Sequence, residues 1–265
     1  MPRRRSRRVG GALCAAVALA WTLSACASGS QSGAASADGA EVRGTINVFA
    51  AASLKEAFTT LAAQFESAQP GTRVTLVFGP SSGLATQINQ GAPADVFASA
   101  SERNMDQVVA AGGADRPTTF ARNVMAVAVP AGNPAGVSSL PDLARPGVKV
   151  ALCQAEVPCG ATAAKVLGNA GLTVRPVTEE VDVKSVLSKV TLGEVDAGLV
   201  YVTDVRAAGD KVRSVSIPQS LNASTSYPIA TVASSKNRVT ARAFTDFVRS
   251  AAGSAVLTAA GFTPP

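Results

Sequence analysis

Three serines stand where an apolar run ends and a helical pattern begins. Ser53 follows the run that starts at Ile46, and Ser81 and Ser82 follow the run over residues 74–78. The first backbone N–H groups of a helix have no partner inside the helix and carry the positive end of its dipole. Such a helix start can hold an anion without a cationic side chain, although a single serine there is typical of an ordinary N-cap.

The same arrangement recurs later in the chain. Cys159 and Gly160 precede a helical pattern that starts at Ala161, and Asp182 and Val183 precede another. None of the four helix starts is itself a lysine or arginine. An anion held there would be held by neutral hydrogen-bond donors.

Ser81 also belongs to a second pattern, because residues 79–83 read Gly-Pro-Ser-Ser-Gly and match the G-x-S-x-G turn of serine hydrolases. The serine of that turn needs a general base, and the chain contains no histidine. A lysine base would be the remaining route, but no Ser-x-x-Lys follows Ser81. A secreted serine hydrolase using Ser81 is the less favoured alternative, and we expect the protein not to be an enzyme.

The N-terminus indicates export. Five arginines precede an apolar stretch over residues 9–23, too short to span a bilayer, and Leu-Ser-Ala-Cys follows at 23–26. This pattern predicts a signal peptide over 1–25, with Cys26 as a lipidated N-terminal residue in the manner of bacterial lipoproteins. Cleavage nearby without lipidation is the alternative. Residues 26–43, rich in Ser, Gly and Ala, would be the anchor and tether.

Composition and charge narrow the possible partners and sites of the protein. The 265-residue chain is 47% hydrophobic, and its net charge of +6 falls to +1 once the five arginines leave with the signal peptide. Because the remaining basic residues are scattered, we expect no nucleic-acid partner. Cys153 and Cys159 remain as the pair in the folded body, and in an exported protein they are expected to form a disulfide, with two free thiols as the alternative. Without histidine, no direct metal ligand set is expected.

Strands and helices are predicted to alternate along the chain, which indicates α/β units with parallel strands covered by helices. The predicted strands are 46–50, 74–78, 95–99, 124–130, 148–152, 173–177, 197–201, 212–217 and 227–233. The predicted helices are 54–67, 84–90, 101–111, 161–168, 183–191, 204–208, 240–250 and 253–260. Residues 87–97 and 187–197 both run from a helix through a glycine turn and an aspartate into a strand, a faint internal echo.

Five segments carry a resemblance to a known family. The stretches FAAASL (49–54), GAPADVF (91–97), VPCG (157–160), DV (182–183) and GLVY (198–201) resemble the periplasmic molybdate-binding proteins of ABC transporters. The first two together are the most specific, and the likeness extends over nearly all of 45–263. The resemblance implies a two-lobed type II periplasmic-binding-protein fold with two crossover segments. Lobe I would comprise 44–122 with 233–265, and lobe II 123–232.

The resemblance also implies a set of site residues. Ser53 and Ser81 would donate hydroxyl and backbone N–H groups to a tetrahedral oxyanion, Cys159 and Val183 would donate backbone N–H groups, and the Tyr201 hydroxyl would complete the shell. Each has a structural alternative: a cap for the serines, and core positions for Cys159, Val183 and Tyr201. Asp95, within the family's most recognisable segment, is expected to be structural.

The ligand and partners follow from the same resemblance. Molybdate or tungstate would be the ligand with no cofactor, and sulfate or another anion on the same fold is the alternative. An ABC transporter permease would be the partner. We expect a monomer outside the cytoplasm, held at the outer face of the cell membrane by its lipid anchor alone.

Overall fold

The structure is a computed structural model that describes residues 41–114 and 116–265. The predicted signal peptide, the lipidation site Cys26 and nearly all of the tether lie outside the described residues. None of the helices in the described ranges is both long and apolar enough to cross a membrane.

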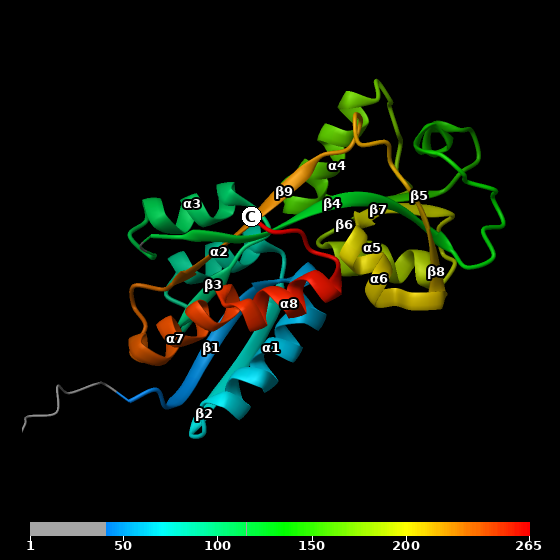
Figure 1. The fold of residues 1–265 in the computed structure, drawn as a ribbon. Coiled ribbons are helices and arrows are strands. Elements are labelled where there is room, and N and C mark those ends of the chain that lie inside the picture. The colour runs from blue at the N-terminus through cyan, green and yellow to red at the C-terminus, as the bar shows by residue number, and fades with distance from the viewer. Residues whose placement is uncertain (1–40, 115) are drawn as a thin grey trace, which may run out of the picture. The chain divides into compact units, whose positions relative to one another are not determined.

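Strands and helices alternate as the sequence predicts, and the α/β class is confirmed (Figure 1). The strands are β1 (Gly44–Ala51), β2 (Thr72–Gly79), β3 (Val96–Ala98), β4 (Thr118–Pro130), β5 (Val150–Cys153), β6 (Thr178–Glu180), β7 (Ala197–Tyr201), β8 (Val212–Val215) and β9 (Ser224–Thr231). The α-helices are α1 (Lys55–Ala68), α2 (Ser81–Asn89), α3 (Glu102–Ala110), α4 (Pro158–Asn169), α5 (Val183–Thr191), α6 (Val202–Ala208), α7 (Arg238–Arg249) and α8 (Ala251–Ala260). Short 3-10 helices are η1 (Ala52–Leu54), η2 (Leu140–Ala144) and η3 (Gly209–Lys211).

The strands form a mixed sheet in the order β2-β1-β3-β9-β4-β7-β5-β6, with β8 paired to β4 beside this path. At one end β1 pairs in parallel with β2 and β3, and at the other β5 pairs in parallel with β6 and β7. Between these parallel sets run β4 and β9, antiparallel to each other and to their other neighbours. Two parallel units are thus joined through two long antiparallel strands.

Helices cover both faces of the first parallel unit, because successive side chains of its strands point to opposite faces of the sheet. Val48 and Ala50 of β1 point into a core shared with α1, α7 and α8, whereas Phe49 points into a separate core with α2 and α3. In β3, Val96 and Phe97 divide between the two cores in the same way. A period of two along buried strands therefore sets the layering of this unit.

The second parallel unit has its own core, built by β5, β7 and the distal part of β4 with α4 and α5. The strand β4 contributes to more than one core, since Ala121 belongs to the α1 side and Val127 to the second unit. The exact lobe boundaries, 44–122 with 233–265 and 123–232, stay a prediction.

The faint echo between residues 87–97 and 187–197 corresponds to one repeated hydrogen-bond pattern. Asp95 Oδ2 accepts from the backbone N–H of Asn47 at 2.8 Å, and Asp196 Oδ2 accepts from that of Lys149, also at 2.8 Å. The backbone N–H of each aspartate returns a bond to the carbonyl of the same partner. Each aspartate thus joins the start of its strand to the neighbouring strand. Ser235 Oγ donates to Asp95 Oδ1 at 2.6 Å, which supports the structural role expected for Asp95.

Two strand predictions were wrong in position. The predicted strand at 173–177 is irregular, and β6 begins only at Thr178, where β5 lies opposite. Val177 is 60% exposed, so its apolar character did not mark a buried strand. Strand β4 begins at Thr118 rather than 124 because β9 pairs with that earlier part. Both differences depend on a partner strand that is distant in the sequence.

Candidate functional site

Four helix starts and the end of a strand meet around one small cavity. All five residues predicted to contact an anion line it: Ser53, Ser81, Cys159, Val183 and Tyr201. The cavity measures about 20 Å³. A single water needs roughly 10–15 Å³ of such space, so the cavity suits one compact ligand.

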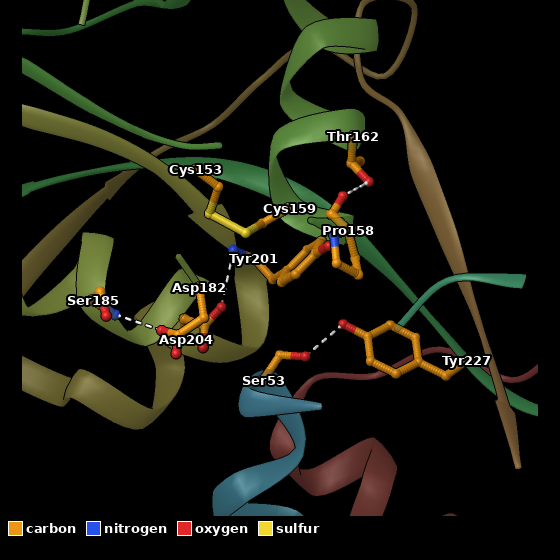
Figure 2. Close-up of a disulfide and its surroundings, with 10 residues drawn as sticks. All are labelled: Ser53, Cys153, Pro158, Cys159, Thr162, Asp182, Ser185, Tyr201, Asp204 and Tyr227. Atoms are coloured by element: carbon orange, nitrogen blue, oxygen red, sulfur yellow. Dashed lines mark hydrogen bonds between the residues drawn. A yellow bond between two sulfur atoms is a disulfide. The ribbon is translucent and has the colours of Figure 1, made fainter. Parts of the chain in front are cut away.

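Ser53 lies in η1, just before α1, and is 4% exposed. The N-caps of η1 and α1 are Ala51 and Leu54, so the alternative that Ser53 serves only as an N-cap is wrong. Its Oγ lies instead 2.9 Å from the hydroxyl oxygen of Tyr227 on β9 (Figure 2). The partner is 174 residues away, and no local pattern could have indicated it.

Ser81 is the first residue of α2 and is also buried. Its Oγ accepts a hydrogen bond from the backbone N–H of Ala100 at 3.0 Å. Because this neighbour is a donor and not a base, the geometry gives no support to Ser81 as an activated nucleophile. A hydroxyl that accepts one bond keeps its own proton for another group, and the cavity is beside it.

Val183 and Cys159 line the cavity from the starts of two helices. Val183 is the first residue of α5, which Asp182 caps by accepting from the N–H of Ser185 at 2.8 Å. Cys159 is the second residue of α4, whose first-turn N–H groups have no partner within the helix. The apolar side chains of both residues belong to the second core, so the backbone alone is offered to a ligand.

A disulfide joins Cys153, at the end of β5, to Cys159 (Figure 2). The loop between them folds back closely on the start of α4. A Cβ atom on Gly160 would lie 1.9 Å from the carbonyl oxygen of Gln154, so only glycine fits there. Crosslink and close backbone approach together fix where the Cys159 N–H points.

Tyr201 ends β7, and its side chain is buried at 1% exposure. Within the described residues its hydroxyl forms no hydrogen bond of ordinary geometry, although the Thr162 and Tyr227 hydroxyls are close enough to oppose the rise in its pKa. An unpaired buried hydroxyl costs roughly 1–3 kcal/mol, and a ligand in the cavity would remove that cost. Burial raises the pKa of Tyr201 well above its usual range, so the group remains an O–H donor.

Apart from Asp182, which caps α5, the charged groups nearest the cavity lie outside its lining. Asp204, fully buried in α6, accepts from the backbone N–H of Tyr201 at 3.1 Å, and its Oδ1 forms an ion pair with Lys184 Nζ at 3.0 Å. Lys184 also reaches Glu56 Oε2 of α1 at 2.7 Å. Burial raises the pKa of Asp204 to about 6 despite the opposing effect of Lys184. Burial would lower the pKa of Lys184, but Asp204 and Glu56 outweigh it and raise that pKa.

Sequence reasoning missed Tyr227, Asp204 and Lys184. The partners that give Lys184 a role, Glu56 and Asp204, are distant in sequence. One available signal was that the chain has two tyrosines: Tyr201 lines the cavity, and the hydroxyl of Tyr227 points to Ser53 (Figure 2).

The lining contains neither lysine nor arginine, and its one carboxylate, Asp182, is engaged as the cap of α5. Within residues 41–114 and 116–265, no group of three or more His, Cys, Asp or Glu side chains could hold a metal ion. The cavity therefore presents O–H and N–H donors, an arrangement that binds an anion rather than a cation.

This fold, with helix starts gathered around a small cavity of neutral donors, defines a solute-binding protein. The chain belongs to the family of bacterial extracellular solute-binding proteins, whose family model matches residues 46–263.

Two relatives carry more specific names. The molybdate-binding protein ModA of Mycobacterium tuberculosis is 45% identical over 222 residues, which cover 83% of this chain and 85% of the relative. The molybdate-binding protein ModA of Escherichia coli is 32% identical over 235 residues, which cover 83% and 89% of the two chains.

Solved structures of binding proteins also resemble this chain. The Azotobacter vinelandii periplasmic molybdate-binding protein matches with a TM-score of 0.74 at 25% identity, covering 83% of this chain and 99% of that one. The sulfate-binding protein SubI of M. tuberculosis matches with a TM-score of 0.72 at 22% identity, covering 83% and 86%. The second likeness concerns the fold alone. Together they confirm the predicted periplasmic-binding-protein fold.

Proposed function

We propose that this protein captures molybdate in the cavity and delivers it to the permease of an ABC transporter. The observation that carries the proposal is that four helix starts and Tyr201 converge on one cavity without a lysine or arginine in its lining. The names of the two ModA relatives support molybdate as the ligand. Tungstate, a dianion of the same tetrahedral geometry, is proposed as a second ligand on chemical grounds.

In this proposal five residues contact the oxyanion. Ser53, Ser81 and Tyr201 donate from hydroxyl groups, and Cys159 and Val183 donate from backbone N–H groups. Each hydrogen bond to a charged group contributes about 1.5–3 kcal/mol. The five bonds together would offset the cost of removing a dianion from water. The donors are set on helix starts and a strand end, so they need little rearrangement.

The neutral donors proposed to contact the ligand would give the site its selectivity, since Oδ1 of the one lining carboxylate, Asp182, caps α5. Phosphate still carries a proton at neutral pH, and that O–H would face groups that all act as donors in the proposed contact set. Molybdate, tungstate and sulfate carry none and satisfy every donor. The choice among these three depends on how closely the cavity fits the size of the ion.

Capture would involve closure of two lobes, 44–122 with 233–265 and 123–232, about β4 and β9 as crossover segments. The closed form would then dock on the permease. The protein would act as a monomer without enzymatic activity. A lipid on Cys26 would hold it at the outer face of the membrane, with the segment before β1 as tether.

Thermal unfolding with added oxyanions tests the proposal. A ligand that binds only the folded state raises the melting temperature by mass action, by an amount that grows with concentration. Molybdate and tungstate should raise it, and phosphate should not. If none of molybdate, tungstate and sulfate shifts the transition, the proposal is wrong; a shift with sulfate alone would favour a sulfate receptor. Labelling of Ser81 by a fluorophosphonate probe would instead indicate a hydrolase.

A further inference from the structure

The hydrogen bond between Ser53 and Tyr227 has a direction that the surrounding groups decide. The two hydroxyl oxygens lie 2.9 Å apart, and both residues are buried. Either hydroxyl could donate by distance alone. A hydroxyl has one proton and can donate one hydrogen bond. If Ser53 donates to Tyr227, it cannot also donate to a ligand.

Asn123 on β4 supplies the deciding contact. Its Oδ1 accepts from the backbone N–H of Val124 at 3.0 Å, so its amide NH₂ points the other way. That NH₂ donates to Thr203 Oγ1 at 2.8 Å and lies 3.5 Å from the Tyr227 hydroxyl oxygen. The Tyr227 oxygen therefore faces a donor on one side, which favours donation of its own proton to Ser53 Oγ on the other.

The ring of Tyr227 is held so that its hydroxyl has little freedom to move. It makes edge-to-face contacts with Phe262, Phe120 and Tyr201 at centroid distances of 5.2, 6.3 and 6.3 Å. Burial raises the pKa of Tyr227 well above its usual range, with the neighbouring Tyr201 adding to the effect. Tyr227 thus keeps its hydroxyl proton at neutral pH.

The two serines of the cavity become equivalent in this arrangement. Ser81 Oγ accepts from the backbone N–H of Ala100, and in the favoured direction Ser53 Oγ accepts from Tyr227. Each serine then has its own proton left for the cavity. The difference is that the partner of Ser81 is backbone, whereas the partner of Ser53 is a side chain that can be changed.

We propose that Tyr227 is a positioning residue for oxyanion capture: its hydroxyl holds Ser53 as a donor toward the cavity and so sets the preference for oxyanions that carry no proton. The inference rests on the proposed function and adds a determinant of selectivity to it. Tyr227 acts through Ser53 and need not touch the ligand. When its hydroxyl is removed, Ser53 is free to turn and accept a proton from a ligand such as phosphate.

The test is a double-mutant cycle with Tyr227→Phe and Ser53→Ala, read by calorimetric titration with molybdate and, separately, phosphate. Tyr227→Phe should weaken molybdate binding by about three- to tenfold, the range expected for one hydrogen bond. It should also strengthen phosphate binding. The ratio of the phosphate to the molybdate dissociation constant should therefore fall by a larger factor than the molybdate dissociation constant rises. In the Ser53→Ala background the same change should leave molybdate binding within about twofold, because its route of action is gone.

A matched control is Ser235→Ala, which removes a buried hydroxyl bonded to Asp95 at 2.6 Å, away from the cavity. It should lower the melting temperature of the unliganded protein and leave the phosphate-to-molybdate ratio unchanged. If Tyr227→Phe weakens binding equally with and without Ser53, or leaves the ratio unchanged, the inference is overturned while the proposed function stands. If the wild type binds no oxyanion, both fall together.

Discussion

Asp204 shows at the scale of single residues how burial sets chemistry near the cavity. The carboxylate is fully buried in α6, accepts a hydrogen bond from the backbone N–H of Tyr201 and forms an ion pair with Lys184. Burial raises its pKa from 3.8 to about 6, which means that the folded protein binds a proton there more readily than the unfolded chain does.

The Asp204→Asn variant tests this shift through the pH dependence of stability. Between pH 3.8 and about 6 the folded state keeps a proton on Asp204 that the unfolded state has lost. The free energy of unfolding of the wild type should therefore fall, relative to the variant, by about 3 kcal/mol as pH rises through this window, and then stay level. Urea unfolding of both proteins at several pH values measures it. A difference that is constant from pH 4 to 7 would contradict the assignment.

Sequence identified the residues with a local signature and missed those without one. Ser53 and Ser81 were found because a hydroxyl stood between an apolar run and a helical pattern. The bonds that orient them come from Tyr227 and the backbone of Ala100, brought near by the sheet. The alternative of Ser53 as a cap could not be dismissed from the sequence for the same reason, since its actual partner is 174 residues away.

At the scale of elements, α1 and α5 face each other through an ion pair beside the cavity. Glu56 in the first turn of α1 and Lys184 in the first turn of α5 are 2.7 Å apart, and the two helices pack into different cores. The lysine follows Val183, a proposed ligand donor. The pair thus connects the two sides from which the proposed donors come.

Glu56→Gln should weaken molybdate binding modestly by removing this connection. A pair as exposed as this one contributes about 0.2–1 kcal/mol, which corresponds to a loss of roughly 1.5- to fivefold, seen mainly as faster dissociation. Stopped-flow displacement measures the rate, and the difference should shrink in high salt. The matched control is Glu194→Gln, whose partner Lys189 at 2.6 Å lies in α5 beside the same core. Equal effects of the two changes would contradict a bridging role.

The elements themselves were largely predictable, because helix starts and apolar runs are encoded locally. The first and last residues of α5 and of β7 are those that the sequence predicts. The failures were β6 and the first part of β4, whose extent is set by β5 and β9 and not by their own residues.

At the scale of the whole molecule, separate cores are linked through β4 and β9, and residues from both parallel units reach the cavity. The family likeness noted from short segments over 45–263 agrees with the match of the family model to 46–263. Sequence alone could not supply the size of the cavity, because that depends on how all these units pack together.

Attachment to the membrane is a prediction that concerns Cys26, outside the described residues. The Cys26→Ser variant should appear in the soluble fraction of the producing cells and incorporate no labelled fatty acid, whereas the wild type should remain with the membrane. Cys14→Ser is the matched control, since that cysteine would leave with the signal peptide. Retention of the Cys26→Ser variant at the membrane, with labelling, would contradict the lipoprotein assignment.

The central claim is that neutral donors hold an oxyanion that carries no proton. Calorimetric titration of the wild type at neutral pH with molybdate and with phosphate tests it most directly. We predict one molybdate per chain and a dissociation constant for phosphate at least about a hundredfold higher, since one unmatched O–H and one lost charged hydrogen bond together cost roughly 3 kcal/mol or more. Comparable affinity for the two ions, or no binding of molybdate, would contradict the account.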